Sequence, residues 1–73
     1  MGLGVSNAPA FAVGQVVYVP LAGVVNVVVI TSVHSSGPFF YYTCTGFETP
    51  IYENLIYSSK EEAEAVAQQY GTF

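Results

Sequence analysis

Between residues 11 and 57, apolar positions recur with a period of two residues, which predicts β-strands rather than helices. In residues 11–19, this alternation places Val17 and Val19 on one face, together with Val13, and Val16 and Tyr18 on the other. The sequence therefore predicts a first strand over residues 11–19, with one of its faces on a core.

Three further strands are expected after the first, separated by turn signals. The second is so rich in Val and Ile that eight of its ten residues are β-branched, which predicts burial on both of its faces. Glycine and proline mark the connections. Short strands at this spacing are typical of a small barrel or sandwich. The expected strands span residues 24–33, 39–45 and 51–57, and the expected connections span residues 20–23, 34–38 and 46–50.

The C-terminal part of the chain changes to a helical pattern. Ser59 and Glu62 have the spacing of a capping box, whose side chains accept hydrogen bonds from backbone N–H groups at a helix start. Gly71 is placed to end the helix. We therefore expect a helix over about residues 59–70. Its apolar positions have the i, i+3, i+4, i+7 spacing of a face that docks on a sheet, and they are Ala63, Val66, Ala67 and Tyr70.

Residues 1–10 lack any such pattern, because glycine, serine, asparagine and proline interrupt the segment. The predicted organisation is an extended N-terminal arm over residues 1–10, followed by one small barrel with its helix over residues 11–73. The fold class is mainly β, with four to five antiparallel strands.

Charge is scarce in this chain and confined to one part of it. One Lys and five Glu make up 8% of the 73 residues and give a net charge of −4, whereas soluble domains average about 25% charged residues. All six charged residues lie between Glu48 and Glu64. We expect the helix to face water, and the uncharged barrel and arm to face partner proteins.

The composition disfavours nucleic-acid binding, a membrane-spanning helix and an internal disulfide. Nucleic-acid binding needs several basic residues, and Lys60 is the only one. The apolar run over residues 16–33 contains Pro20 and Gly23 and has no flanking basic residue, so two strands fit it better than a membrane helix. Cys44 is the only cysteine, so no disulfide forms within the chain. Small domains without disulfides often gain stability by oligomerisation, and we expect a homo-oligomer.

Few residues could carry catalytic chemistry. His34 and Cys44 are the only candidates for a base and a nucleophile, and a lone cysteine in a strand is more often a small core residue. Zinc needs three or four ligands, more than one Cys and one His supply. Glu48 and Glu53 could form a carboxylate pair, but a cap on the barrel end or an ion pair with Lys60 fits them better. We expect no enzymatic activity, no metal and no cofactor.

Aromatic side chains are the more informative set. Residues 39–42 place large rings on both faces of one strand, and a barrel this small has room inside for one face only. Aromatic residues are enriched at interface cores, where Lys and Glu are depleted. The alternative is that the tyrosine hydroxyls face water. The residues that we assign to protein interfaces are Leu3, Val5, Phe11, Phe39, Phe40, Tyr41, Tyr42, Phe47 and Phe73.

Two segments carry a resemblance to a known group. Residues 13–18, V-G-Q-V-V-Y, resemble the opening strand of SH3-like small barrels, and residues 53–63, E-N-L-I-Y-S-S-K-E-E-A, resemble the closing segment of small phage-encoded proteins with that barrel. The resemblance implies a barrel closed by a final strand and packed by a helix. It also implies a phage origin, and it transfers no catalytic residue.

These observations give three functional hypotheses. The first is a structural protein of a phage virion, made in the host cytoplasm and located on the capsid surface as a cement or decoration protein that contacts the major capsid protein or other virion proteins. The second is a head–tail or tail component of the same virion. The third is an intracellular, non-enzymatic adaptor that binds a protein or peptide through an aromatic groove.

Overall fold

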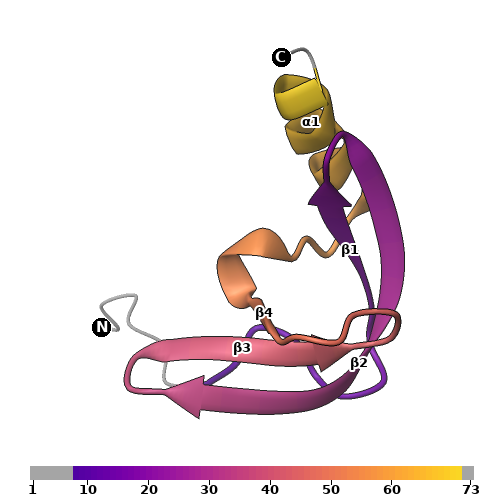
Figure 1. Ribbon diagram of the computed structural model, residues 1–73. Helices are drawn as coiled ribbons and strands as arrows, with labels where there is room; N and C mark the ends of the chain where they lie inside the picture. The colour runs from indigo at the N-terminus through magenta and orange to yellow at the C-terminus, as the bar shows by residue number, and fades with distance from the viewer. Residues whose placement is uncertain (1–7, 72–73) are drawn as a thin grey trace.

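The computed structural model describes residues 8–71, with side chains to Gln69, and shows a mainly β fold (Figure 1). Four antiparallel strands, in the order β1-β2-β3-β4, curl into a half-barrel, and one helix follows them. The mainly β fold with antiparallel strands and the C-terminal helix are thus as the sequence predicts. The elements are β1 (Val16–Leu21), β2 (Val24–Ser36), β3 (Phe39–Cys44), β4 (Ile51–Tyr52), the 3₁₀ turn η1 (Glu53–Leu55) and α1 (Lys60–Gly71).

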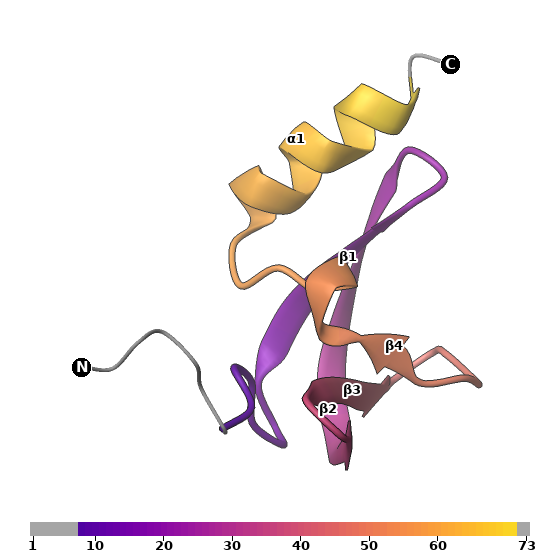
Figure 2. The same ribbon diagram turned by 90° about the vertical axis from the view of Figure 1, so that its left-hand side faces the viewer.

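Strand β2 forms the bend of the half-barrel. Its first half pairs with β1, and its second half pairs with β3. The pairing shifts between Ile30 and Ser32, so Thr31 is an extra residue that bulges out of the register. A bulge bends its strand and increases its twist, and β2 consequently carries the chain from one part of the sheet into the other (Figures 1 and 2).

The half-barrel is drawn together at its open side by a single bridge. Tyr18 and Tyr57 exchange two backbone hydrogen bonds of 2.9 Å each. The prediction of a fourth strand over residues 51–57 is wrong in its length. The strand ends at Tyr52, because η1 follows it directly. The turn changes the direction of the chain, and this redirection brings Tyr57 beside β1. The closing strand expected from the resemblance is therefore present only as this bridge.

The core lies on the concave side of the sheet and is built from alternating strand positions. Hydrophobic burial of such side chains contributes about 1.5–3 kcal/mol each for a large residue. The buried residues of this cluster are Val17, Val19, Val28, Ile30, Tyr42, Cys44, Ile51 and Ile56.

The prediction that the second strand is buried on both faces is wrong. Val28 and Ile30 are buried, but Val27, which points to the opposite face of this strand, is 61% exposed. Packed side chains cover the concave side of the half-barrel only, and the convex side of the hairpin keeps its apolar residues.

Other predicted boundaries also differ from the structure, and β1 runs on to Leu21, so that only Ala22 and Gly23 make the first turn. The first strand begins at Val16 rather than at Phe11, because Gly14 has a φ of +91° and Gln15 N–H donates to the Ala12 carbonyl in a turn (3.1 Å). The connection predicted over residues 34–38 is shorter, since β2 runs to Ser36 and only two residues make the turn.

Helix α1 packs beside the β1–β2 hairpin, at the far end of β2 from the β2–β3 turn (Figures 1 and 2). The Ser59 half of the predicted capping box is present, because the Ser59 hydroxyl accepts a hydrogen bond from Glu62 N–H (3.2 Å). Ala63 and Ala67 are buried, as their spacing predicts. Among the described residues, no helix is long and apolar enough to cross a membrane.

The β1–β2 turn holds a strained residue and yields a first prediction. Ala22 and Gly23 have φ values of +53° and +79°, the pattern of a type I′ turn, in which asparagine is preferred at the first position. The left-handed conformation costs a residue such as alanine about 1–2 kcal/mol. We expect Ala22→Asn to raise the free energy of unfolding by about 0.5–1 kcal/mol, measured by urea denaturation. Ala22→Val should lower it, and equal stability of the two variants would contradict this assignment.

Candidate functional site

The interface residues assigned from sequence are placed very differently by the fold. Leu3, Val5 and Phe73 lie outside the described residues. Phe11, Phe40 and Phe47 are partly buried and pack against the core. Phe39 is 66% exposed, and Tyr41 is half-buried on the outer side of the sheet. Tyr42 is 0% exposed.

The side chain of Tyr42, which the sequence analysis assigned to an interface, lies in the core of the half-barrel. Its ring packs edge-on against Phe11, with 5.5 Å between the ring centroids. Its hydroxyl donates to Glu53 Oε1 (2.6 Å) and accepts from Phe11 N–H (3.3 Å). The sequence could not separate Tyr42 from Tyr41, because either face of a strand could point inward.

Glu53 joins this network to the segment that precedes β1. Its Oε1 also accepts a hydrogen bond from Ala10 N–H (3.2 Å). Burial is the main cause of a raised pKa for Tyr42, followed by its hydrogen bond to the Glu53 carboxylate. Glu53 thus caps one end of the half-barrel, as its sequence context suggests.

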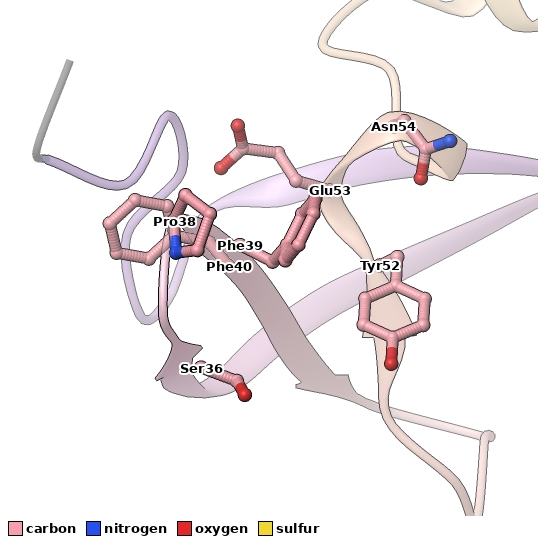
Figure 3. Close-up of a pocket in the computed structure, with 7 residues that line it drawn as sticks. All are labelled: Ser36, Pro38, Phe39, Phe40, Tyr52, Glu53 and Asn54. Carbon is pink, nitrogen blue, oxygen red and sulfur yellow. The ribbon is translucent and has the colours of Figure 1, made fainter. Parts of the chain in front are cut away.

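Beside Glu53 lies a groove of about 650 Å³. Figure 3 shows side chains from the β2–β3 turn and β3 on one side of it and side chains from β4 and η1 on the other, with the Glu53 carboxylate pointing away from Tyr52. A volume of this size is typical of small-ligand and peptide-side-chain pockets. The groove is lined by Ser36, Pro38, Phe39, Phe40, Tyr52, Glu53 and Asn54.

An aromatic row crosses the outer side of β2, β3 and β4. His34 is opposite Tyr41, and Tyr41 is opposite Tyr52. The rings of His34 and Tyr41 stack at 5.1 Å, and those of Tyr41 and Tyr52 meet edge-on at 5.8 Å. His34 Nε2 is also within hydrogen-bond distance of the Ser32 hydroxyl (2.9 Å) and the Thr43 hydroxyl (3.0 Å). The row is therefore a partly polar surface that contains no Lys, Arg, Asp or Glu.

A second surface, which we call the hairpin face, was missed by the sequence analysis. It consists of Val16, Tyr18, Val27 and Val29 on the outer side of β1 and β2, where Val16 is opposite Val29 and Tyr18 is opposite Val27. Val16 and Val27 are exposed. The signal that could have found it was the same valine density that we interpreted as burial on both faces.

Four of the six charged side chains lie on α1. Lys60 and Glu64 on α1 form an exposed ion pair (3.8 Å), which contributes little to stability. Glu61 and Glu62 on the same helix are also exposed. The helix therefore presents its charges to water, as the sequence predicts.

The candidate catalytic pair is not brought together. Cys44 is in the core with Tyr42, whereas His34 lies on the outer side of the sheet against Tyr41. Within residues 8–71, no group of three or more His, Cys, Asp or Glu residues is placed to hold a metal ion.

Cys44 yields a prediction about alkaline stability. Burial raises the pKa of its thiol above the ordinary value of 9.0, so the unfolded chain releases this proton at a lower pH than the folded chain. The stabilisation is complete below about pH 9 and is lost as the pH rises above it. The raised pKa of Tyr42 acts in the same direction above its ordinary value of 10.0.

We therefore expect the free energy of unfolding to fall between about pH 9 and pH 11, measured by urea denaturation in a series of buffers. In Cys44→Ala, the decline should begin nearer pH 10, where Tyr42 becomes the main contributor. An identical pH profile for the two proteins would contradict the role given to the thiol.

No family model matches the chain, and neither a curated protein nor a solved structure matches it significantly.

Proposed function

We propose that this protein is a non-enzymatic structural protein of a phage virion that acts through protein–protein contacts, as a capsid cement or decoration protein. The observation that carries the proposal is the separation of charge from apolar exposure. Large apolar side chains are exposed on the uncharged sheet, while four of the six charged residues are on the outer side of α1. Contiguous exposed apolar surface marks interaction sites in soluble proteins.

The phage and capsid parts of the proposal rest on the resemblance of residues 13–18 and 53–63 to phage-encoded small barrels. The mechanism is simple in physical terms. A small rigid half-barrel that spans two neighbouring capsid subunits buries apolar area on each of them, and this burial resists their separation under internal pressure.

The test is the location of the chain in a particle. We expect it to co-sediment with gradient-purified virions, in many copies per particle, and to appear as density on the outer capsid surface. Density at the neck or tail would instead support the head–tail alternative. Absence from purified virions, with the chain soluble and monomeric in the host cytoplasm, would overturn the virion proposal.

The groove favours a second candidate function, a non-enzymatic adaptor that binds an extended peptide. Its aromatic lining and half-open shape suit an uncharged peptide better than a charged one, because Glu53 is its only charged group and already accepts two hydrogen bonds. This candidate predicts saturable peptide binding that Phe39→Ala or Tyr52→Ala abolishes. The control variant Val24→Ala, at the opposite end of β2 from the groove, should retain it.

A further inference from the structure

The first half of β2 has an open edge on the side away from β1. Tyr18 of β1 uses both its N–H and its C=O to bond Tyr57, so these two groups point away from β2. Residues that face each other in an antiparallel ladder either exchange two hydrogen bonds or turn their backbone groups away from each other. Val27 is opposite Tyr18, and Val25 is opposite Pro20, which has no N–H. The N–H and C=O groups of Val25 and Val27 therefore point to the free side of β2.

In the described part of the chain, no residue pairs with these groups of Val25 and Val27. The same side of β2 is occupied only from Val29 onward. The Val29 carbonyl accepts a hydrogen bond from Thr45 N–H (3.0 Å), and Val29 N–H donates to the Thr45 hydroxyl (3.0 Å). Strand β3 pairs with β2 from Ile30 on. Figure 1 accordingly shows β1 on one side of the first half of β2 and no strand on the other side.

The outer edge of β1 is protected, whereas this edge of β2 is not. Pro20 removes a donor from the edge of β1, and Tyr57 bonds to its middle. Proteins protect strand edges with proline, lysine or a covering segment, because unpaired N–H and C=O groups template the addition of another strand. Residues 24–29, V-V-N-V-V-V, contain neither proline nor a charged residue, and Val27 is 61% exposed. This edge therefore has the properties of a site for an extended strand.

We propose that a second copy of this chain supplies that strand, by antiparallel pairing of residues 25–27 about a twofold axis at Asn26. Val25 of each copy is then opposite Val27 of the other copy. Each such pair exchanges two N–H···O=C hydrogen bonds, so every outward-pointing backbone group of these residues gains a partner in both copies.

The edge is self-complementary, which favours a second copy over an unrelated strand. A twofold pairing uses the same surface on both molecules, and Val25 and Val27 supply equal numbers of donors and acceptors to it. The pairing joins two hairpins into one continuous sheet and places Val27 beside Val25 of the second copy. Lys60 and Glu64 of α1 line a hollow together with Val25, and they form an ion pair (3.8 Å). Two copies therefore bring no uncompensated charge from this hollow to the contact.

The contact is small, so the expected dimer is weak. The strand pairing involves residues 25–27 of each copy, far fewer than the roughly 20–30 residues a side of a standard interface. We therefore expect the copies to pair at millimolar rather than nanomolar concentration.

The experiment measures sedimentation equilibrium and amide hydrogen exchange of the full chain from micromolar to millimolar concentration. We expect a monomer that becomes a dimer. The Val25 and Val27 amides should slow about tenfold once nine-tenths of the chains are paired, because only the monomer exposes them. The Asn26 and Val28 amides, which point toward β1, should be protected throughout.

Three results would overturn the proposal. The first is a monomer at every concentration. The second is a dimer in which the Val25 and Val27 amides keep their monomer rates, since another surface would then form it. The third is protection of these amides only when purified virions are added to a monomeric chain, which would assign the edge to a foreign strand.

Two substitutions at one position separate the backbone edge from the side-chain surface. Val27→Pro removes an outward N–H but no bond to β1, and it should weaken the dimer at least about tenfold, because each dimer loses two hydrogen bonds. Val27→Thr keeps the N–H and nearly the same shape, and it should retain the dimer. Equal weakening by both would contradict edge pairing. The exchange measurement on the original chain requires neither variant to fold, and no outcome depends on whether the protein is found in a virion.

Discussion

Replacement of Tyr42 by alanine is expected to lower the free energy of unfolding by about 3–5 kcal/mol, a large part of the total stability of the chain. Tyr42 is 0% exposed and is among the largest fully buried side chains, and removal of a buried aromatic ring costs about 3–5 kcal/mol. A 73-residue domain has a total stability of about 4–11 kcal/mol at the usual 0.05–0.15 kcal/mol per residue. Urea denaturation followed by circular dichroism measures the loss.

The milder variant Tyr42→Phe isolates the hydroxyl group. It keeps the ring but removes the donor to Glu53 (2.6 Å) and the acceptor of Phe11 N–H. Hydrogen bonds to charged groups contribute about 1.5–3 kcal/mol, so we expect a loss in that range. A double-mutant cycle with Glu53→Gln should give a coupling energy above about 0.5 kcal/mol. If Tyr42→Phe is as stable as the original protein, the network does not stabilise the fold.

The second large effect is expected at the interface between α1 and the sheet. Ala63 is 0% exposed, so Ala63→Gln must place a larger and polar side chain where no space or partner is available. Overpacking costs about 1–3 kcal/mol, and an unpaired buried polar group costs about 1–3 kcal/mol more. We expect a loss of at least about 2 kcal/mol in the free energy of unfolding, measured in urea.

The control for this variant is Ala65→Gln on the same helix. Ala65 is exposed. The substitution is the same as at Ala63, so both variants change the helix propensity by the same amount. Its effect should stay within about 0.5 kcal/mol. Equal losses for Ala63→Gln and Ala65→Gln would show that α1 is not docked through Ala63.

The periodic parts of the sequence predicted the fold well, and the reasons can be traced to residues. Val17 and Val19 point inward as the alternation requires, and Ser59 caps the helix as its spacing to Glu62 requires. Both features depend on neighbours in the sequence. The bulge at Thr31 could not be predicted, because it depends on how β3 pairs with β2, and this pairing brings together residues more than ten positions apart.

The candidate site was predicted only in part, for a related reason. Sequence alone showed that the aromatic residues of the third strand must divide between two faces, and the structure shows that Tyr42 faces the core while Phe39 and Tyr41 do not. The sequence suggested an aromatic groove as one hypothesis but did not indicate where in the fold it lies. Its position depends on η1, which the alternation pattern of residues 51–57 concealed.

The fold shows which outer surfaces of the chain lack charged side chains. The half-barrel has its uncharged hairpin face and aromatic row on the outside, where a monomer would normally place charged side chains. We therefore propose that these two surfaces, and not α1, contact partner proteins.

Hydrogen–deuterium exchange of the chain, free and bound to particles assembled without it, tests this claim most directly. The account predicts that binding slows exchange in the outward-facing strands β1, β2 and β3 and leaves exchange in α1 unchanged. Protection confined to α1, or no binding to the particles at all, would contradict it.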